Sequence, residues 1–174
     1  MIELYKPDIY KKDIYSIDYL KLKSYGIKCL LLDLDNTLVT NYVKKPTRKL
    51  KDFIEKLKEM GFKVIIFSNS NKKRILPFKV VLEVDCSASS RKPFKGKFKK
   101  VLSDYKYSLS EVAIIGDQIM TDIYGGNNMG IFTVLVNPIS NKEPIGTKIN
   151  RVFEKIIIKK MKKKGIFDRN KYYE

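Results

Sequence analysis

Two aspartates two positions apart, Asp33 and Asp35, directly follow the apolar run 27–32. In an extended chain, residues i and i+2 point the same way, so both carboxylates would face one side. A parallel strand delivers such side chains to its carboxyl end, where open α/β sheets place their ligand crevices. Burying charge is costly, so two acids at the end of a core strand are expected to serve a cation or a reaction. The alternative is a strand that ends in a solvated Asp-Asn turn.

Polar residues also follow three further expected strands, at 62–67, 80–85 and 112–115. These residues are Ser68 and Asn69 after the first strand, Lys92 after the second, and Asp117 and Asp122 after the third. If the strands are parallel, all of these side chains meet Asp33 and Asp35 at one edge of the sheet.

Together these residues supply a hydroxyl, a lysine and four carboxylates, which magnesium-assisted phosphoryl transfer to a carboxylate requires. Carboxylates hold a hard cation through oxygen, and one carboxylate can attack phosphorus. Lysine and serine can balance the charge on the transferring oxygens. The chain contains no histidine, which excludes Ser-His-Asp hydrolases, papain-type thiol enzymes and the usual zinc hydrolases.

The elements that must position these residues alternate between strand and helix. Pro46 and Thr47 open a helix whose apolar face ends at Gly61, and a further helix is expected at 94–105. A short helix is expected at 72–76, and one that begins near Thr121 should give way to the glycine-rich stretch 125–130. Because the strands are continuously apolar, the fold class is α/β: a three-layer, doubly wound parallel sheet without a large cap domain.

We expect residues 1–147 to form one catalytic domain, with residues 1–25 as an extension packed on it. Residues 148–174 should form a basic amphipathic helix and tail. Within 149–161, apolar residues recur at helical spacing, and lysine and arginine occupy much of the remaining surface. The apolar stripe either packs on the sheet or lies on an anionic membrane. Packing is the simpler interpretation, because helices of globular proteins are commonly amphipathic.

The charge balance is strongly basic, since 36 Lys and Arg face 19 Asp and Glu, a net charge of +17. This favours anionic partners such as nucleic acid, acidic lipid headgroups or phosphorylated small molecules. No apolar stretch approaches the roughly 20 residues of a membrane span, and the start of the chain is unlike a signal peptide. A cytoplasmic protein is expected, with peripheral contact at the inner membrane face as an open alternative.

The motifs resemble those of the haloacid dehalogenase (HAD) superfamily. They are Asp-Leu-Asp-Asn-Thr at 33–37, Ser68, Lys92 in Arg-Lys-Pro, and Gly-Asp-Gln-Ile-Met-Thr-Asp at 116–122. The more local resemblance is to the small YqeG-like, class IIIA phosphatases and the related phosphatidylglycerophosphate phosphatases. It includes Gly126-Asn127 and the basic helix near Asn150-Arg151. The resemblance implies a HAD-like Rossmannoid fold and a hydrolase of phosphoric monoesters.

The resemblance also implies a role for each motif residue. Asp33 would be the nucleophile that forms an aspartyl-phosphate, and Asp35 the general acid and base, with its backbone carbonyl on Mg²⁺. Lys92 would pair with Asp33 and the phosphate. Thr37 would support the loop geometry, and Ser68 and the Asn69 backbone amide would bind the phosphate. Asp33 and Asp117 would bind Mg²⁺. Asp122 would bind Mg²⁺ directly or hold one of its ligands.

The substrate is less well defined by the sequence. The gaps from Thr37 to Ser68 and from Ser68 to Lys92 are too short for a cap domain, which predicts an open pocket suited to a bulky or membrane-embedded phosphate ester. By resemblance, phosphatidylglycerophosphate, a precursor of phosphatidylglycerol and cardiolipin, is the first expectation. A soluble nucleotide or sugar phosphate is the alternative within the superfamily. An RNA- or ribosome-binding protein without catalysis is the alternative from another class and ranks second to the phosphatase, because no RNA-binding motif with stacked aromatics at recognisable spacing is present.

Overall fold

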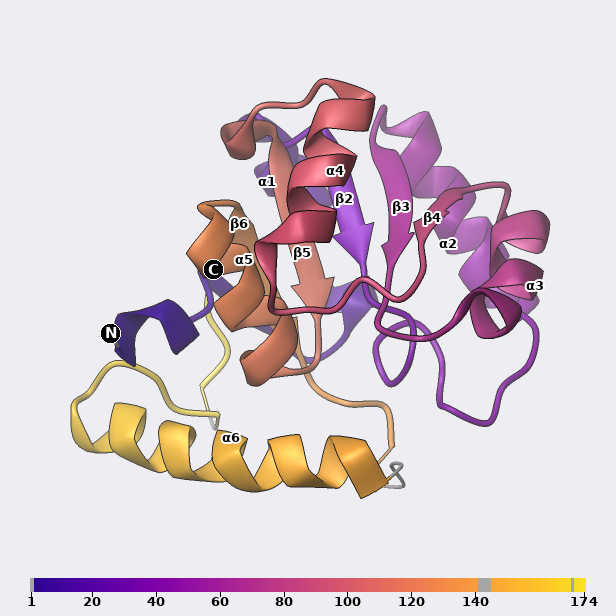
Figure 1. Ribbon diagram of the computed structural model, residues 1–174. Coiled ribbons are helices and arrows are strands. Elements are labelled where there is room, and N and C mark those ends of the chain that lie inside the picture. The colour runs from indigo at the N-terminus through magenta and orange to yellow at the C-terminus, as the bar shows by residue number, and fades with distance from the viewer. Residues whose placement is uncertain (1, 141–144, 170) are drawn as a thin grey trace.

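A single parallel sheet of six strands forms the centre of the molecule, in the order β1-β6-β5-β2-β3-β4 (Figure 1). The computed structural model describes residues 2–140, 145–169 and 171–174, with the helical backbone alone at 145–149. The strands are β1 (Ile9–Lys11), β2 (Cys29–Leu32), β3 (Lys63–Phe67), β4 (Asp85–Ser87), β5 (Val112–Gly116) and β6 (Phe132–Val136). The predicted doubly wound α/β fold is confirmed.

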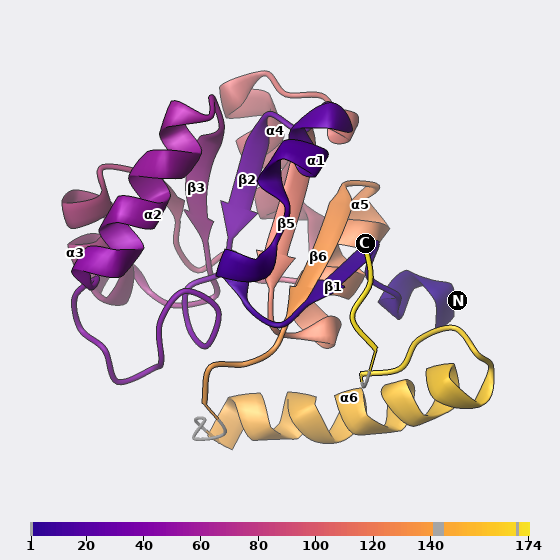
Figure 2. The same ribbon diagram turned by 180° about the vertical axis from the view of Figure 1, so that it is seen from behind.

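Helices cover both faces of this sheet (Figures 1 and 2). One face carries α1 (Tyr19–Ser24), α2 (Arg48–Glu59) and α3 (Lys72–Leu82), and the other carries α4 (Lys95–Tyr105) and α5 (Tyr124–Met129). A π-helical turn, η4 (Ile119–Ile123), leads into α5, and short 3₁₀ turns lie at Ile2–Tyr5, Ile14–Ser16 and Leu109–Glu111. Because both faces are covered, every residue of β2 and β5 is buried.

The chain between Thr37 and Ser68 forms only a loop, α2 and β3, so no cap domain is inserted there. The side chain of Thr47 caps α2 by accepting a hydrogen bond from the Leu50 amide at 3.2 Å. The helix ends before Gly61, whose φ of +89° lies in the left-handed region. The predicted absence of a cap domain therefore holds for this connection.

The segment from 72 to 87 differs from the sequence expectation. The helix expected to end at Leu76 continues through Pro77 to Leu82, and the strand expected at 80–85 is the shorter β4. The continuation buries Phe78 and Leu82 in the core beside Ile75, a helical spacing that offsets the hydrogen bond lost at the proline.

Helix α5 passes through two glycines that the sequence suggested would end it. A β-carbon on Gly126 would lie 2.6 Å from methyl groups of Ile114 and Thr133, so this position lets α5 approach the sheet closely. We expect Gly126→Ala to lower the free energy of unfolding by about 1–3 kcal/mol, because the core is overpacked. The matched change Gly96→Ala in α4, where nothing lies within 4 Å, should leave it unchanged or slightly higher. Urea unfolding of both variants measures the difference, and equal losses would contradict this packing argument.

Helix α6 (Ile145–Lys163) lies across the edge of the sheet where the strands end (Figures 1 and 2). After it, the chain returns to β1, and the backbones of Tyr10 and Tyr173 exchange two hydrogen bonds of 3.0 Å. Within the described part of the chain, no helix is long and apolar enough to cross a membrane.

The apolar residues of α6 divide between two faces. Met161 is fully buried in a cluster with Ile157 and Ile158, whereas Val152, Phe153 and Ile156 are about half exposed or more. Packing, the simpler interpretation of the stripe, therefore holds for only part of it. The remaining stripe member, Ile149, lies where only the backbone is described.

Candidate active site

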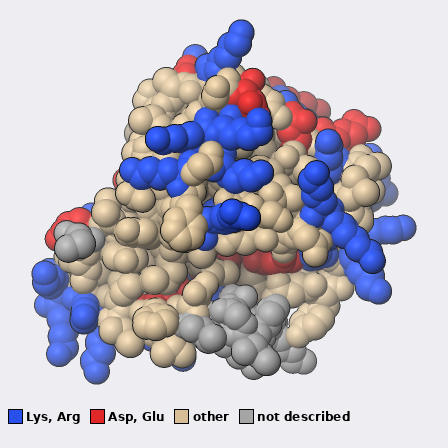
Figure 3. All heavy atoms as spheres, in the orientation of Figure 1, with Lys and Arg blue, Asp and Glu red and all other residues tan. Residues whose placement is uncertain are grey.

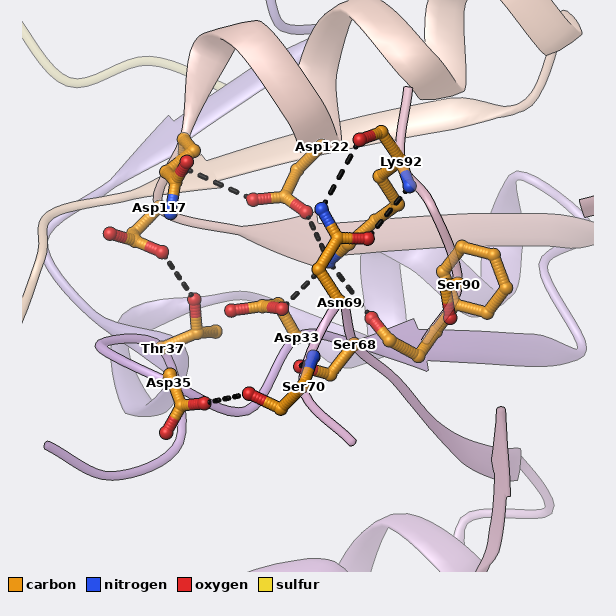
Figure 4. Close-up of polar contacts among 12 residues, drawn as sticks. Asp33, Asp35, Thr37, Ser68, Asn69, Ser70, Ser90, Lys92, Asp117 and Asp122 are labelled. Carbon is orange, nitrogen blue, oxygen red and sulfur yellow. Dashed lines mark hydrogen bonds and ion pairs between the residues drawn. The ribbon is translucent and has the colours of Figure 1, made fainter. Parts of the chain in front are cut away.

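The predicted residues gather at the carboxyl ends of β2, β3 and β5 (Figure 4). Asp33 extends β2 by one residue, since its amide donates to the Ile115 carbonyl at 3.0 Å. The chain then turns sharply at Asn36, whose φ of 68° is left-handed, a conformation that asparagine tolerates. This turn brings Thr37 back toward the end of β5, where its hydroxyl donates to Asp117 at 3.0 Å.

Lys92 links two of the carboxylates. Its Nζ lies 2.7 Å from Oδ1 of Asp33 and 2.6 Å from Oδ1 of Asp122, and it donates to the Phe67 carbonyl at 2.9 Å. Only 2% of its side chain is exposed. Burial alone would lower the pKa of Lys92, but the Asp122 and Asp33 carboxylates outweigh it and hold the pKa above its ordinary value. Lys92 is therefore a fixed ammonium with every donor engaged.

The side chain of Asn69 holds the loop that carries Lys92. Its Oδ1 accepts from the Lys92 amide at 2.7 Å, and its Nδ2 donates to the Lys92 carbonyl at 3.2 Å. Ser68 is 2% exposed, and its Oγ accepts from the Ser70 amide at 3.2 Å. Both residues thus lie at the site, and the Asn69 side chain has a supporting task that the sequence did not suggest.

The absence of a side chain at Gly116 creates the space for Asp122. A β-carbon there would lie 2.2 Å from Cγ of Asp122, which no real structure tolerates. The second oxygen of Asp122 accepts from the Gln118 amide at 3.1 Å, which fixes the orientation of this carboxylate toward Lys92. Gly116 and Asp117, at the end of β5, therefore contribute in two ways. Asp117 supplies a carboxylate, and Gly116 leaves the space that the Asp122 carboxylate occupies.

Arg151 of α6 also reaches the site, and this contact was not predicted. Its guanidinium forms an ion pair with the Asp117 carboxylate and donates to the Asp117 carbonyl at 2.9 Å. Glu154, one turn further along α6, accepts from Arg151 at 2.8 Å and from the Ile119 amide at 3.3 Å, and it pairs with Arg169. Sequence reasoning noted Asn150-Arg151 only as part of the resemblance, because a contact between residues 34 positions apart leaves no local signal.

Burial raises the pKa of two of the acids. It raises the pKa of Asp33 to about 6, although Lys92 beside it acts in the opposite direction. It raises the pKa of Asp117 to about 8 against the opposing effect of Arg151. These carboxylates pay a desolvation cost that a further cation would reduce.

The acids fit a hard divalent cation. Asp33, Asp117 and Asp122 are all buried and offer carboxylate oxygens that lie within 4.8 Å of one another. Once all three are ionised, as cation binding would favour, their three negative charges exceed the two positive charges of Lys92 and Arg151 that contact them. Oxygen donors with excess negative charge are the ligand set that Mg²⁺ prefers.

The Asp35 side chain lies outside this carboxylate cluster and points toward Ser70 (Figure 4). It accepts a hydrogen bond from the Ser70 hydroxyl and two from Arg74 of α3, at 3.0 Å from Nε and 2.7 Å from Nη2. Neither partner was predicted. Ser70 belongs to the polar run after β3, but Arg74 carries no motif and meets Asp35 only through the packing of α3.

A cavity of about 220 Å³ joins Asp33, Asp35 and Lys92 to the outside. Its lining residues are Asp33, Asp35, Asn41, Ser68, Asn69, Ser70, Lys92, Gln118 and Thr121. A larger groove of about 470 Å³ lies beside α1 and α2, but no cluster of buried acids faces it. The smaller cavity is therefore the candidate active site, and its volume leaves room for a phosphate group.

Comparison with known proteins places the chain in a family. The chain is 35% identical to the probable phosphatase YqeG of Bacillus subtilis (strain 168), over 94% of its own length and 95% of that protein. The chain belongs to the YqeG family of HAD-type phosphatases. Two family descriptions match parts of it, mitochondrial PGP (phosphatidylglycerophosphate) phosphatase at residues 2–75 and HAD-hydrolase-like at residues 89–143. The predicted resemblance is confirmed, and the protein is a hydrolase of this phosphatase class.

The chain is also similar to a plant protein in sequence and to a solved structure in fold. The chain is 31% identical to phosphatidylglycerophosphate phosphatase 1, chloroplastic/mitochondrial, of Arabidopsis thaliana, over 92% of its own length and about half (49%) of that protein. The cobalt-bound deoxy-D-mannose-octulosonate 8-phosphate phosphatase of Haemophilus influenzae superposes with a TM-score of 0.51 at 16% identity. This match covers 85% of the chain and 96% of that structure, and it shows the fold alone.

Proposed function

We propose that the protein is a Mg²⁺-dependent phosphomonoesterase that forms an aspartyl-phosphate on Asp33. The observation that carries the proposal is the buried Lys92 ammonium between Asp33 and Asp122, beside Asp117. Asp33, Asp117 and Asp122 would hold Mg²⁺, which neutralises charge on the phosphoryl oxygens when bound. Lys92 fixes the Asp33 carboxylate and adds positive charge where the transferring oxygens gather.

In the first step, an Asp33 oxygen forms a bond to phosphorus as the bond to the ester oxygen breaks. Asp35 gives its proton to the departing oxygen, so the alcohol leaves neutral. In the second step, Asp35 takes a proton from water, which attacks phosphorus and releases inorganic phosphate with Asp33 restored. Ser70 and Arg74 hold the Asp35 carboxylate at the cavity wall between these events.

The proposed substrate is phosphatidylglycerophosphate. The plant relative at 31% identity carries that substrate in its name. The short β2–β3 connection leaves the site uncapped, so a phosphate attached to a large lipid can enter while the acyl chains remain outside. The net charge of +17 favours an anionic lipid.

Metal removal and a substrate panel test this proposal. Hydrolysis of an aryl phosphate should stop in EDTA and return with added Mg²⁺, and metal-independent turnover would overturn the metal requirement. Phosphate release from phosphatidylglycerophosphate in mixed micelles should exceed release from sugar phosphates and nucleotides by at least about tenfold in kcat/KM. Equal or lower activity on the lipid would overturn the substrate assignment and leave the phosphatase class intact.

The role of Asp35 has a test of its own. An alkyl leaving oxygen needs a proton, whereas a nitrophenolate leaves without one. Asp35→Asn should therefore lower the rate of the first step with an alkyl phosphate by about 10²–10⁴-fold. The same rate with nitrophenyl phosphate should fall by much less. Single-turnover kinetics measure the first step for both substrates. The control Asp13→Asn, an acid in the loop before α1, should change neither rate. Equal losses on both substrates would contradict proton donation by Asp35.

A further inference from the structure

We propose that the outer face of α6 docks on an anionic phospholipid bilayer. The inference rests on the proposed function in one respect: an enzyme that acts on a lipid must reach the membrane that contains it. The docking itself is argued from this face of the helix.

Three apolar side chains stand exposed on adjacent turns of α6. Val152 is 58%, Phe153 54% and Ile156 49% exposed. Glu154 and Met161, by contrast, are 1% and 0% exposed. At about 100° per residue, Val152 and Ile156 lie opposite Glu154 and Met161 on the helix. Val152 and Ile156 are thus on the side turned away from the sheet, and Phe153, about 100° from Glu154, lies exposed on the flank beside them.

Contacts of the inner face fix this orientation of α6. Arg151 pairs with Asp117, Glu154 accepts from the Ile119 amide, and Met161 packs in a buried cluster. Rotation of α6 to hide Phe153 would remove Glu154 from Arg169 and Arg151 from the buried Asp117 carboxylate. The apolar outer face therefore cannot be buried by rotation of α6 without the loss of these contacts.

Lysines surround the apolar residues and extend the face toward the end of α6. Lys155, Lys159, Lys160, Lys163 and Lys164 are exposed, and Figure 3 shows a group of basic side chains over the end of α6, at the lower left. The one acid in the sequence of α6, Glu154, points inward. The outer face is thus apolar and cationic without an opposing charge of its own.

This chemistry fits an anionic bilayer. A helix that lies in the membrane interface places apolar side chains among the acyl chains and lysines among the headgroups. A nucleic acid would engage the lysines but leave Val152, Phe153 and Ile156 in water. Because α6 lies across the edge of the sheet where the strands end (Figure 1), docking of its outer face would turn this edge of the molecule toward the membrane.

Flotation with vesicles tests the proposal without catalysis. The protein should float with phosphatidylcholine vesicles that contain 30% phosphatidylglycerol, fail to float with pure phosphatidylcholine, and be released by 0.5 M NaCl. Val152→Ser/Ile156→Ser should weaken flotation at least tenfold. The control Leu76→Ser/Val80→Ser removes two exposed apolar side chains at the same spacing in α3 and should float as the wild type does.

Charge is tested with a second matched pair. Lys155→Gln/Lys159→Gln in α6 should weaken flotation severalfold, and Lys95→Gln/Lys99→Gln in α4 should not, although each variant loses two charges at the same spacing. Equal losses in both pairs would mean that only net charge matters and would overturn the assignment to α6.

Three further results would overturn the proposal. They are wild-type protein that does not float, an α6 variant that floats unchanged, and a wild-type dimer that dissociates with Val152→Ser/Ile156→Ser in sedimentation velocity. The last would show that a second copy covers the face. Turnover of an aryl phosphate, measured on the same samples, reports separately on the proposed function, since it should be equal in the wild type and in both serine variants.

Discussion

Replacement of Asp33 by asparagine is expected to lower turnover of an aryl phosphate at saturating Mg²⁺ by at least about 10³-fold. The amide keeps the shape of the side chain but cannot form the bond to phosphorus. The fold should persist, because the carboxylate is buried at a desolvation cost that the neutral amide does not pay. Steady-state kinetics give the rate, and near-ultraviolet circular dichroism checks the fold.

A covalent readout makes this prediction specific to the nucleophile. Rapid quench of the wild type with a ³²P-labelled substrate should trap a base-labile phosphoprotein, and the asparagine variant should give none. Asp52→Asn, at an exposed acid on α2, should retain both the label and the rate. Labelled protein in the Asp33 variant would show that another residue carries the phosphoryl group.

Replacement of Lys92 by methionine is expected to lower the free energy of unfolding by about 3 kcal/mol in EDTA. The change leaves Asp33 and Asp122, which share the Lys92 ammonium, buried without their common partner. Turnover should also fall at least about 10²-fold, since the positive charge near the transferring oxygens is lost. Urea unfolding and the aryl phosphate assay measure the two effects.

A second substitution separates charge from shape in this result. Lys92→Met/Asp122→Asn should recover at least about 1 kcal/mol of the lost stability, because one of the two uncompensated carboxylates is gone, while activity stays low. Lys63→Met, at the partly exposed pair with Asp85, should cost less than about 1 kcal/mol. If the Lys92 variant loses no more than the Lys63 variant, the buried pairs do not stabilise the fold as argued.

The centre of the fold was predictable because its signals are local. Continuous apolar runs predicted β2, β3 and β5, since strands buried on both faces leave no room for polar residues. The position of the acids that follow β2 and β5 could be predicted from the direction of the strands alone. Parallel strands end at one edge, so the convergence of Asp33 and Asp117 required no knowledge of the packing.

Other parts of the molecule depend on contacts that no short window contains. β1 has only three residues and exists because it pairs with β6, more than 120 positions later. Arg74 meets Asp35 and Arg151 meets Asp117 only after α3 and α6 have docked. Gly126 gives a local signal that is misleading. A glycine suggests a break in the helix, whereas its small size is what lets α5 pack on the sheet.

The pairing of Tyr173 with Tyr10 places the last described residues along the outer edge of the sheet. An uncovered edge strand is a template on which other chains can add, and proteins protect such edges with short strands, charge or a covering segment. Here β1 is three residues long, Lys11 pairs with Glu174, and the returning backbone takes up both hydrogen-bonding groups of Tyr10. The segment that follows α6 thus protects the protein against edge-to-edge aggregation.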